Sequence, residues 1–300
     1  MRIQESECGG GLGQAGQLPV KFMKSKLVYA GLGFLNLLVL LAVLFGLQTL
    51  IRGRVPDLLG LTLMSLTLLV SYVAGVRWIE RREPEELLHR AAGREFLYGL
   101  ILGICLFVTV MLVLWMAGVY HPTGRGSIAP LAAGFLTAFL AAVSEEIIFR
   151  GFLFRLTQKL GGMWGALAVT SILFGAAHAA NKGATVGSSV AIALEAGVLL
   201  GAAYALTQRL WLPIGLHLGW NFAEGSIFGM SVSGGAQKGA LITGELHGKT
   251  LLTGGAFGPE ASIVAVVVCL TAAIYLLWKP THRPKSEVSG PYRFAPEKAT

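Results

Sequence analysis

Long apolar runs separated by short polar segments make up most of the chain. The first run covers residues 27–51, which exceeds the roughly 20 residues that a helix needs to cross a bilayer. Seven further runs follow at 57–78, 96–118, 128–149, 162–180, 188–207, 211–230 and 260–278. The pattern therefore predicts an all-α, polytopic integral membrane protein with about eight transmembrane helices.

Polar segments flank and interrupt these runs. Residues 1–24 are rich in glycine and contain no apolar core of the signal-peptide kind, so we predict a disordered N-terminal tail. Residues 25–279 are expected to form one eight-helix transmembrane domain, followed by a C-terminal tail over residues 280–300. The segment 77–95 is rich in glutamate and is predicted to be a short, solvated amphipathic stretch.

The composition agrees with a membrane protein. Of the 300 residues, 54% are hydrophobic and 13% are charged, whereas soluble domains carry about 25% charged residues. The three cysteines, Cys8, Cys105 and Cys269, are too widely spaced for a disulfide framework or a zinc knuckle. The net charge of +8 is carried by residues beside apolar runs, so we expect a membrane and no nucleic acid as partner.

The distribution of basic residues predicts the orientation in the membrane. Eight crossings place both termini on the same side. If that side is the cytoplasm, 18 of the 24 lysines and arginines lie in cytoplasmic segments and six lie in outside loops. Because cytoplasmic loops carry an excess of basic residues, both termini are predicted to be cytoplasmic.

The fourth apolar run ends in the sequence Glu145-Glu146-x-x-x-Arg150. Ionisable residues within apolar runs are candidates for function, because they are costly in a bilayer. Glu146 and Arg150 share one helix face and are expected to form an ion pair. Glu145 points about 100° away around the helix and is left with a free carboxylate. The alternative for Glu146 and Arg150 is an ion pair at a helix end.

Two further runs each contribute a polar pair at a spacing of four residues. Phe174 and His178 share a face, and the small residues between them allow another helix to approach closely. His217 and Asn221 also share a face, and both side chains can form hydrogen bonds or bind a metal. Each pair alone is better explained by contacts between helices. Together with Glu145 they supply the base and the donors that amide hydrolysis needs.

These three motifs, in this order, resemble those of the CAAX protease and bacteriocin-processing (CPBP) family, also called the type II CAAX prenyl endopeptidase or Abi family. The segment Thr253–Glu260 resembles a further element of bacterial members, so the family motifs span 128–262. The resemblance implies an intramembrane endopeptidase of the bacterial cell membrane. Its protein or peptide substrates would reach the site from the cytosolic leaflet.

The resemblance also implies a role for each motif residue. Glu145 would activate a water molecule with help from His178, while His217 and Asn221 would form the oxyanion hole. The supporting residues would be Glu146, Arg150 and Phe174. In a metalloprotease version, Glu145, His178 and His217 would bind a divalent metal such as zinc; we favour the metal-free, glutamate-type mechanism.

Two acidic residues fall outside the motifs. Glu195 is expected to form a packing hydrogen bond to another helix, with a substrate contact as the alternative. Glu224 is expected to be a carboxylate at the edge of a loop. Two other classes of function stay open: a non-catalytic scaffold or immunity protein, and a transporter, which the lack of internal duplication disfavours.

Overall fold

The structure is a computed structural model that describes residues 17–51, 53–88, 90–237 and 239–279. The predicted C-terminal tail, 280–300, and residues 1–16 of the predicted N-terminal tail lie outside the described residues. Helix α1 (Gln17–Ile51) begins within the segment predicted to be disordered.

Each predicted apolar run corresponds to a helical segment. After α1 come α2 (Asp57–Trp78), α3 (Ala92–Met116), α4 (Leu131–Glu146), α5 (Arg155–Ala177), α6 (Val186–Ile192), α7 (Val198–Thr207), α8 (Trp211–Phe222) and α10 (Ile263–Trp278). Five described stretches are long and apolar enough to cross a membrane, and α10 is a shorter apolar helix. The structure thus confirms an all-α polytopic membrane protein.

The fourth helix is longer than the apolar pattern indicates. Helix α4 continues through the π-helical segment η1 (Ile147–Phe154) into α5. The chain turns back only at Gly162, whose φ of 72° and ψ of 179° are accessible mainly to glycine. The predicted boundary at residue 149 is therefore wrong. Because Arg150 is neutralised inside the bundle, its charge does not end the helix.

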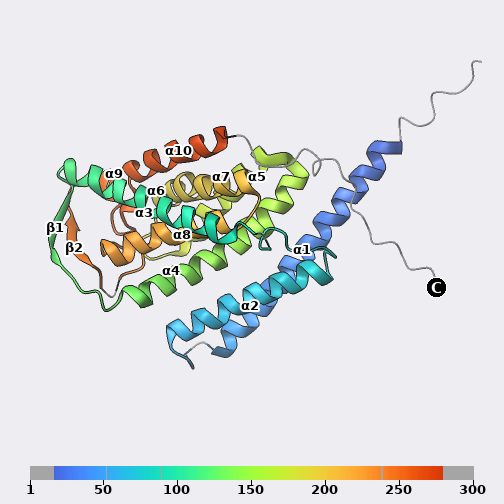
Figure 1. The fold of residues 1–300 in the computed structure, drawn as a ribbon, viewed down its shortest axis with the longest axis horizontal. Helices are drawn as coiled ribbons and strands as arrows, with labels where there is room; N and C mark the ends of the chain where they lie inside the picture. Colours follow the sequence, from blue (N-terminus) through green and yellow to red (C-terminus); the bar gives the residue numbers. More distant parts are fainter. Residues whose placement is uncertain (1–16, 52, 89, 238, 280–300) are drawn as a thin grey trace, which may run out of the picture.

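A two-stranded antiparallel sheet, formed by segments far apart in the sequence, closes one end of the bundle (Figure 1). Strand β1 (Tyr120–Arg125) pairs antiparallel with β2 (Ile242–Leu246), and the short helix α9 (Thr250–Thr253) lies at the same end. Helix α10 runs away from this sheet, and α1 begins at the opposite end of the molecule. The sequence pattern did not predict the sheet.

Helices α3 and α8 pack closely through glycine. Gly99 and Gly103 of α3 face α8, while Gly215 and Gly219 of α8 face α3, and a Cβ atom at any of these positions would collide with the opposite backbone. Such small residues at four-residue spacing allow helices in a membrane to approach closely. The contact fixes α8 on both sides of His217, which lies between its two glycines.

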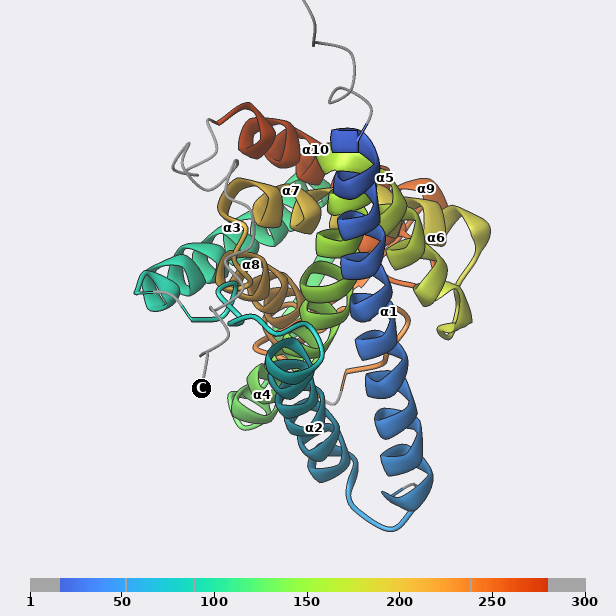
Figure 2. The same cartoon turned by 90° about the vertical axis from the view of Figure 1, so that its right-hand side faces the viewer.

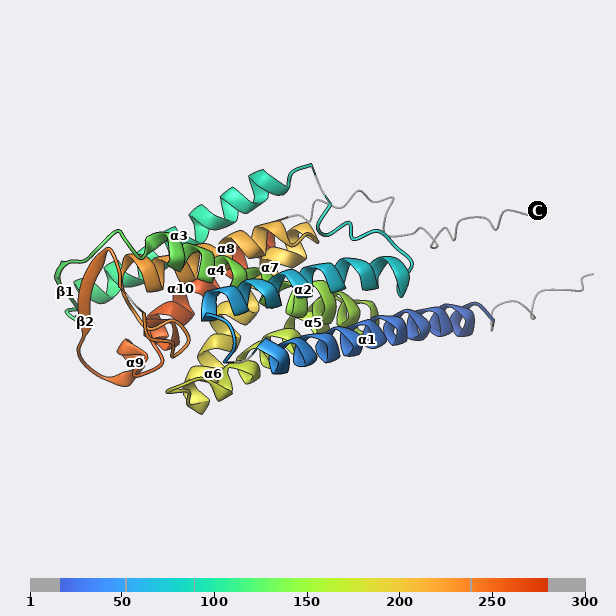
Figure 3. The same ribbon diagram turned by 90° about the horizontal axis from the view of Figure 1, so that it is seen from below.

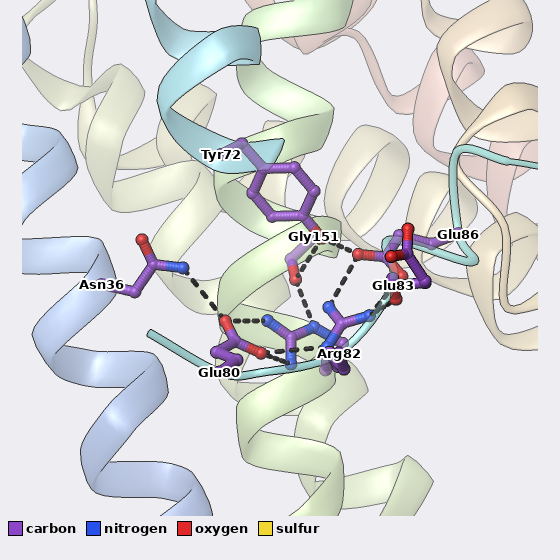
Figure 4. Close-up of polar contacts among 8 residues, drawn as sticks. Asn36, Tyr72, Glu80, Arg82, Glu83, Glu86 and Gly151 are labelled. Atoms are coloured by element: carbon purple, nitrogen blue, oxygen red, sulfur yellow. Dashed lines mark hydrogen bonds and ion pairs between the residues drawn. The ribbon is translucent and has the colours of Figure 1, made fainter. Parts of the chain in front are cut away.

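Helices α1 and α2 lie together on one side of the bundle, with α1 alongside α5 (Figures 2 and 3). A buried polar cluster joins the middle of α1 and the end of α2 to the bundle (Figure 4). Glu80 accepts hydrogen bonds from Asn36 of α1 at 3.1 Å and from Arg155 of α5 at 2.7 and 2.8 Å. Arg82 bridges Glu80 and Glu86. The prediction of a solvated stretch holds for exposed residues such as Glu83 and Glu85. It is wrong for Glu80 and Glu86, because these carboxylates are buried and find partners on neighbouring helices.

Candidate active site

Glu145 meets both predicted histidines. Since α4 is continuous, Glu145 lies near the middle of the long helix, and the chain returns beyond Gly162 to bring His178 to the same level. Glu145 Oε2 lies 3.8 Å from His178 Nε2 and 4.0 Å from His217 Nε2. That oxygen is buried and has no hydrogen-bond partner among the described residues.

Glu146 and Arg150 form the expected ion pair, and they form it deep in the bundle. Arg150 Nη1 donates to Glu146 Oε1 at 2.8 Å, and both side chains are fully buried. His217 Nδ1 donates to the same oxygen at 3.0 Å. Arg150 Nη2 also donates to the backbone carbonyls of Ala196 and Gly197. The pair is therefore no helix-end contact; it orients His217 and joins three helical elements.

His178 is held by its own helix and by Phe174. Its Nδ1 donates to the Phe174 carbonyl at 2.8 Å, and the two ring centroids lie 4.7 Å apart. The Arg150 guanidinium carbon lies 4.8 Å from the Phe174 ring centroid, a cation–π distance. A Cβ at Gly175 would collide with the backbone at Ser189, so the small residues in this motif do allow the close approach that was expected.

The hydrogen bonds of the two histidines fix which ring nitrogen faces Glu145. Both Nδ1 atoms donate, so in a neutral ring Nε2 is an acceptor. Glu145 Oε2 is an acceptor as well, and three acceptors therefore converge. Only a donor among them, such as a water molecule or a proton on one ring, satisfies this arrangement. The geometry suits the holding and deprotonation of water.

A small cavity adjoins the histidines. Its volume is about 20 Å³, which is room for about one water molecule. His178, His217 and Asn221 line it, and Asn221 is half-buried with no recorded hydrogen bond to any described residue. Its amide is thus free to donate to a bound group. Glu145 reaches the histidines from α4 and does not itself line the cavity.

Four polar residues that line the cavity were not assigned to the site from the sequence: Glu195, Trp220, Ser233 and Glu260. Glu260 lies in the 3₁₀ turn η5 (Pro259–Ala261) and accepts a hydrogen bond from the Ser233 backbone at 2.6 Å. Ser233 and Glu260 belong to loops, where no helical spacing reveals a shared face. Trp220 precedes Asn221 in the chain, so the His217–Asn221 motif was the signal in the sequence that could have placed Trp220 near the site.

The two acids outside the motifs differ from one another. Glu195 lies in the π-helical segment η3 (Ala193–Gly197) and receives a hydrogen bond from the Cys269 thiol of α10, the kind of packing contact that was expected. Glu224 lies in the π-helical segment η4 (Ala223–Ile227) and is completely buried. The prediction of a loop-edge carboxylate is wrong, because α8 continues into η4 and η5 packs against Glu224.

The predicted metal ligands do not have the spacing of a metal site. Tetrahedral zinc ligands at about 2.0–2.1 Å from the ion lie roughly 3.3 Å from one another. The Glu145 carboxylate is 3.8 and 4.0 Å from the two histidines. Across the described ranges, no group of three or more His, Cys, Asp or Glu residues is arranged to hold a metal ion.

The fold and these residues together define a class: a helical membrane protein with a buried acid–histidine site between its helices. Residues 127–223 match the family model described as type II CAAX prenyl endopeptidase Rce1-like. The matched segment contains all three motifs and covers about a third of the chain. The match confirms the resemblance to the CPBP family over this segment. The family supports a CAAX-type intramembrane endopeptidase in general terms. No curated protein sequence matches the chain.

Proposed function

We propose that the protein is a glutamate-type intramembrane endopeptidase that cleaves membrane-associated proteins or peptides. The observation that carries this proposal is the buried Glu145 oxygen, which has no partner among the described residues and faces Nε2 of both His178 and His217. A water molecule held between Glu145 and His178 loses a proton to Glu145 and attacks the scissile carbonyl. His178 orients the water.

In this proposal His217 and Asn221 stabilise the oxyanion that forms on the carbonyl oxygen. Because His217 Nδ1 donates to Glu146, its Nε2 donates to an oxyanion only when the ring carries both protons. The neighbouring carboxylates of Glu145 and Glu146 are suited to stabilise that charged ring. Asn221 adds a neutral donor from the next turn of α8. Preorganised donors of this kind typically account for about 10²–10³ in rate.

The test is cleavage by purified full-length protein in detergent. Its probes are a library of membrane-spanning peptides and a farnesylated peptide ending in a CAAX sequence, each with and without chelator. Wild type is expected to cleave in the presence of chelator, and Glu145→Gln to lose about 10²–10⁴ in rate. Glu245→Gln, at an exposed carboxylate of β2, is the matched control and is expected to retain activity.

Two other outcomes point to other functions. Cleavage by wild type that stops with chelator would favour the metal-dependent version of the protease. Absence of cleavage for every probe would contradict the proposal and favour a non-catalytic scaffold or immunity protein. Solute uptake by proteoliposomes, without cleavage, would favour a transporter.

A further inference from the structure

Glu195 lines the cavity but has no role in the mechanism above. It is 2% exposed and lies in η3, between α6 and α7. Leu199 and Leu200 line the same cavity, as do His178 and His217. The carboxyl group therefore lies in largely apolar surroundings, next to the space in which the reaction is proposed to occur.

Glu195 takes part in no recorded ion pair within the described parts of the chain. Its neighbours are the Cys269 thiol, which donates a hydrogen bond to it, and the Glu260 carboxyl group. Arg150 lies close to η3, but its guanidinium binds the Ala196 and Gly197 carbonyls and pairs with Glu146. An ionised Glu195 would be a buried charge without a cation, beside a second carboxyl group. Such a group is expected to be a neutral carboxylic acid.

We propose that Glu195 is a further catalytic residue, the general acid that protonates the leaving amine. This inference rests on the proposed endopeptidase function. Amide cleavage needs such a donor, because an amine anion is too basic to leave unprotonated. Glu145 reaches the histidines from α4 and Glu195 lines the cavity from η3, so the base and the acid come from different helices.

The proton balance of the step closes. Glu145 takes one proton from water as the new carbon–oxygen bond forms. Glu195 gives its proton to the amide nitrogen as the carbon–nitrogen bond breaks, and the amine leaves. Glu145 then returns its proton to the Glu195 carboxylate through His178, which faces Glu145 and lines the cavity. One water and one amide have become one carboxylic acid and one amine, and both residues are restored.

The test compares two leaving groups in the same farnesylated CAAX peptide. One version has the scissile amide and the other has a thioester in its place. Thiols ionise with a pKa of about 8.5, so a thiolate leaves without protonation. Glu195→Gln is expected to lower kcat for the amide by about 10²–10⁴ and to change kcat for the thioester by less than about threefold.

Two control variants interpret the result. Glu145→Gln is expected to lose both reactions, because both need the activated water. Glu224→Gln alters a buried carboxyl that does not line the cavity, and it is expected to affect both substrates equally. If Glu195→Gln does not fold, Glu195→Asp keeps an acid at a shorter reach and is expected to slow the amide selectively.

Equal losses for amide and thioester, or no loss for either, would overturn the role of Glu195. Failure of the wild-type protein to cleave the amide, in this peptide and in every peptide of the library, would instead overturn the endopeptidase function, and the inference with it. A wild type that cleaves both, with a selective amide defect in the Glu195 variant, supports both proposals.

Discussion

Glu145 and Glu146 are neighbours in the chain, and α4 turns them toward different partners. Glu146 pairs with Arg150 and His217, whereas Glu145 Oε2 has no hydrogen-bond partner among the described residues. A spacing of four residues predicts the pairing of Glu146 and Arg150 from the sequence, because positions i and i+4 share a helix face. The free carboxylate of Glu145 follows from the same geometry.

This difference predicts that two similar substitutions affect the stability of the protein differently. Glu146→Gln leaves the buried Arg150 without its anionic partner, and breaking such a pair costs about 3–5 kcal/mol. The melting temperature of the purified variant is therefore expected to fall clearly. Glu145→Gln is the matched control and is expected to melt within a few degrees of wild type. Equal melting temperatures for all three proteins would contradict the assignment of Glu146 as a structural anchor.

Other residues of the site have no signal in the sequence. Ser233 and Glu260 come from loops, and the tertiary fold alone brings them to the cavity. Glu195 and Glu224 are visible as acids within apolar runs, but spacing along one helix does not reveal which cavity or neighbour they meet. Sequence reasoning found the pairs within helices, and the family resemblance brought Glu145, His178 and His217 together, but the contacts made by the loops were missed.

At the scale of elements, apolar runs predict helices well because a lipid-facing helix must be apolar over its whole length. They predict helix ends poorly where a charge is neutralised internally. Arg150 was taken to mark an end, yet its partners lie within the bundle and the helix continues to Gly162. The buried segment after α2 was misjudged for the same reason, since Glu80 pairs with Arg155 from a distant helix.

The glycine contact between α3 and α8 gives a prediction at this scale. Gly103→Ala places a methyl group against the α8 backbone, and overpacking of this kind typically costs about 1–3 kcal/mol. Gly93→Ala, on the same helix with nothing within 4 Å, is the control and is expected to be neutral or stabilising. The measurement is thermal unfolding in detergent together with the cleavage rate, because α8 carries His217. Loss of stability in both variants alike would argue against close packing at Gly103.

At the scale of the whole molecule, the polar cluster of Figure 4 ties the α1–α2 pair to the bundle. Burial raises the pKa of the Glu80 carboxyl. The opposing effect of Arg155 and Arg82 is larger, so the pKa of Glu80 lies below its usual value. Glu86 follows the same pattern through Arg82. A depressed pKa in the folded state stabilises the protein above the unfolded value of about 4.3, and this stability is lost as pH falls through the folded pKa.

The protein is therefore expected to lose melting temperature as the pH falls below about 4.3. Glu80→Gln removes one titrating group, so the variant should be less stable at neutral pH and show a flatter dependence on pH in that range. Melting curves of wild type and variant at buffered pH values across about pH 3–7 measure this dependence of the melting temperature on pH. If the melting temperature of the variant changed with pH as steeply as that of wild type, groups other than Glu80 would be responsible for the pH dependence.

Membrane orientation gives a second prediction at this scale. The distribution of basic residues predicts that both termini are cytoplasmic. The loop between η4 and β2, which contains Ser233, lies at the end of the bundle near the strands, away from the start of α1. Under that orientation, Ser233→Cys in a protein without its three native cysteines should react with an impermeant thiol reagent only from outside the cell. Labelling only from the cytoplasmic side would instead support access from the cytosolic leaflet and reverse the assigned orientation.

The turn at Gly162 determines how Glu145 and His178 are placed relative to each other. Glu145 lies before this turn and His178 after it, each about 24–26 Å of helix away. With arms of this length, a change of about 5° in the angle at Gly162 displaces His178 by about 2 Å relative to Glu145. That displacement is about half of the 3.8 Å between Glu145 Oε2 and His178 Nε2. The backbone angle of Gly162 therefore sets the distance between Glu145 and His178, although this glycine lies at the far end of the two helical segments that carry them.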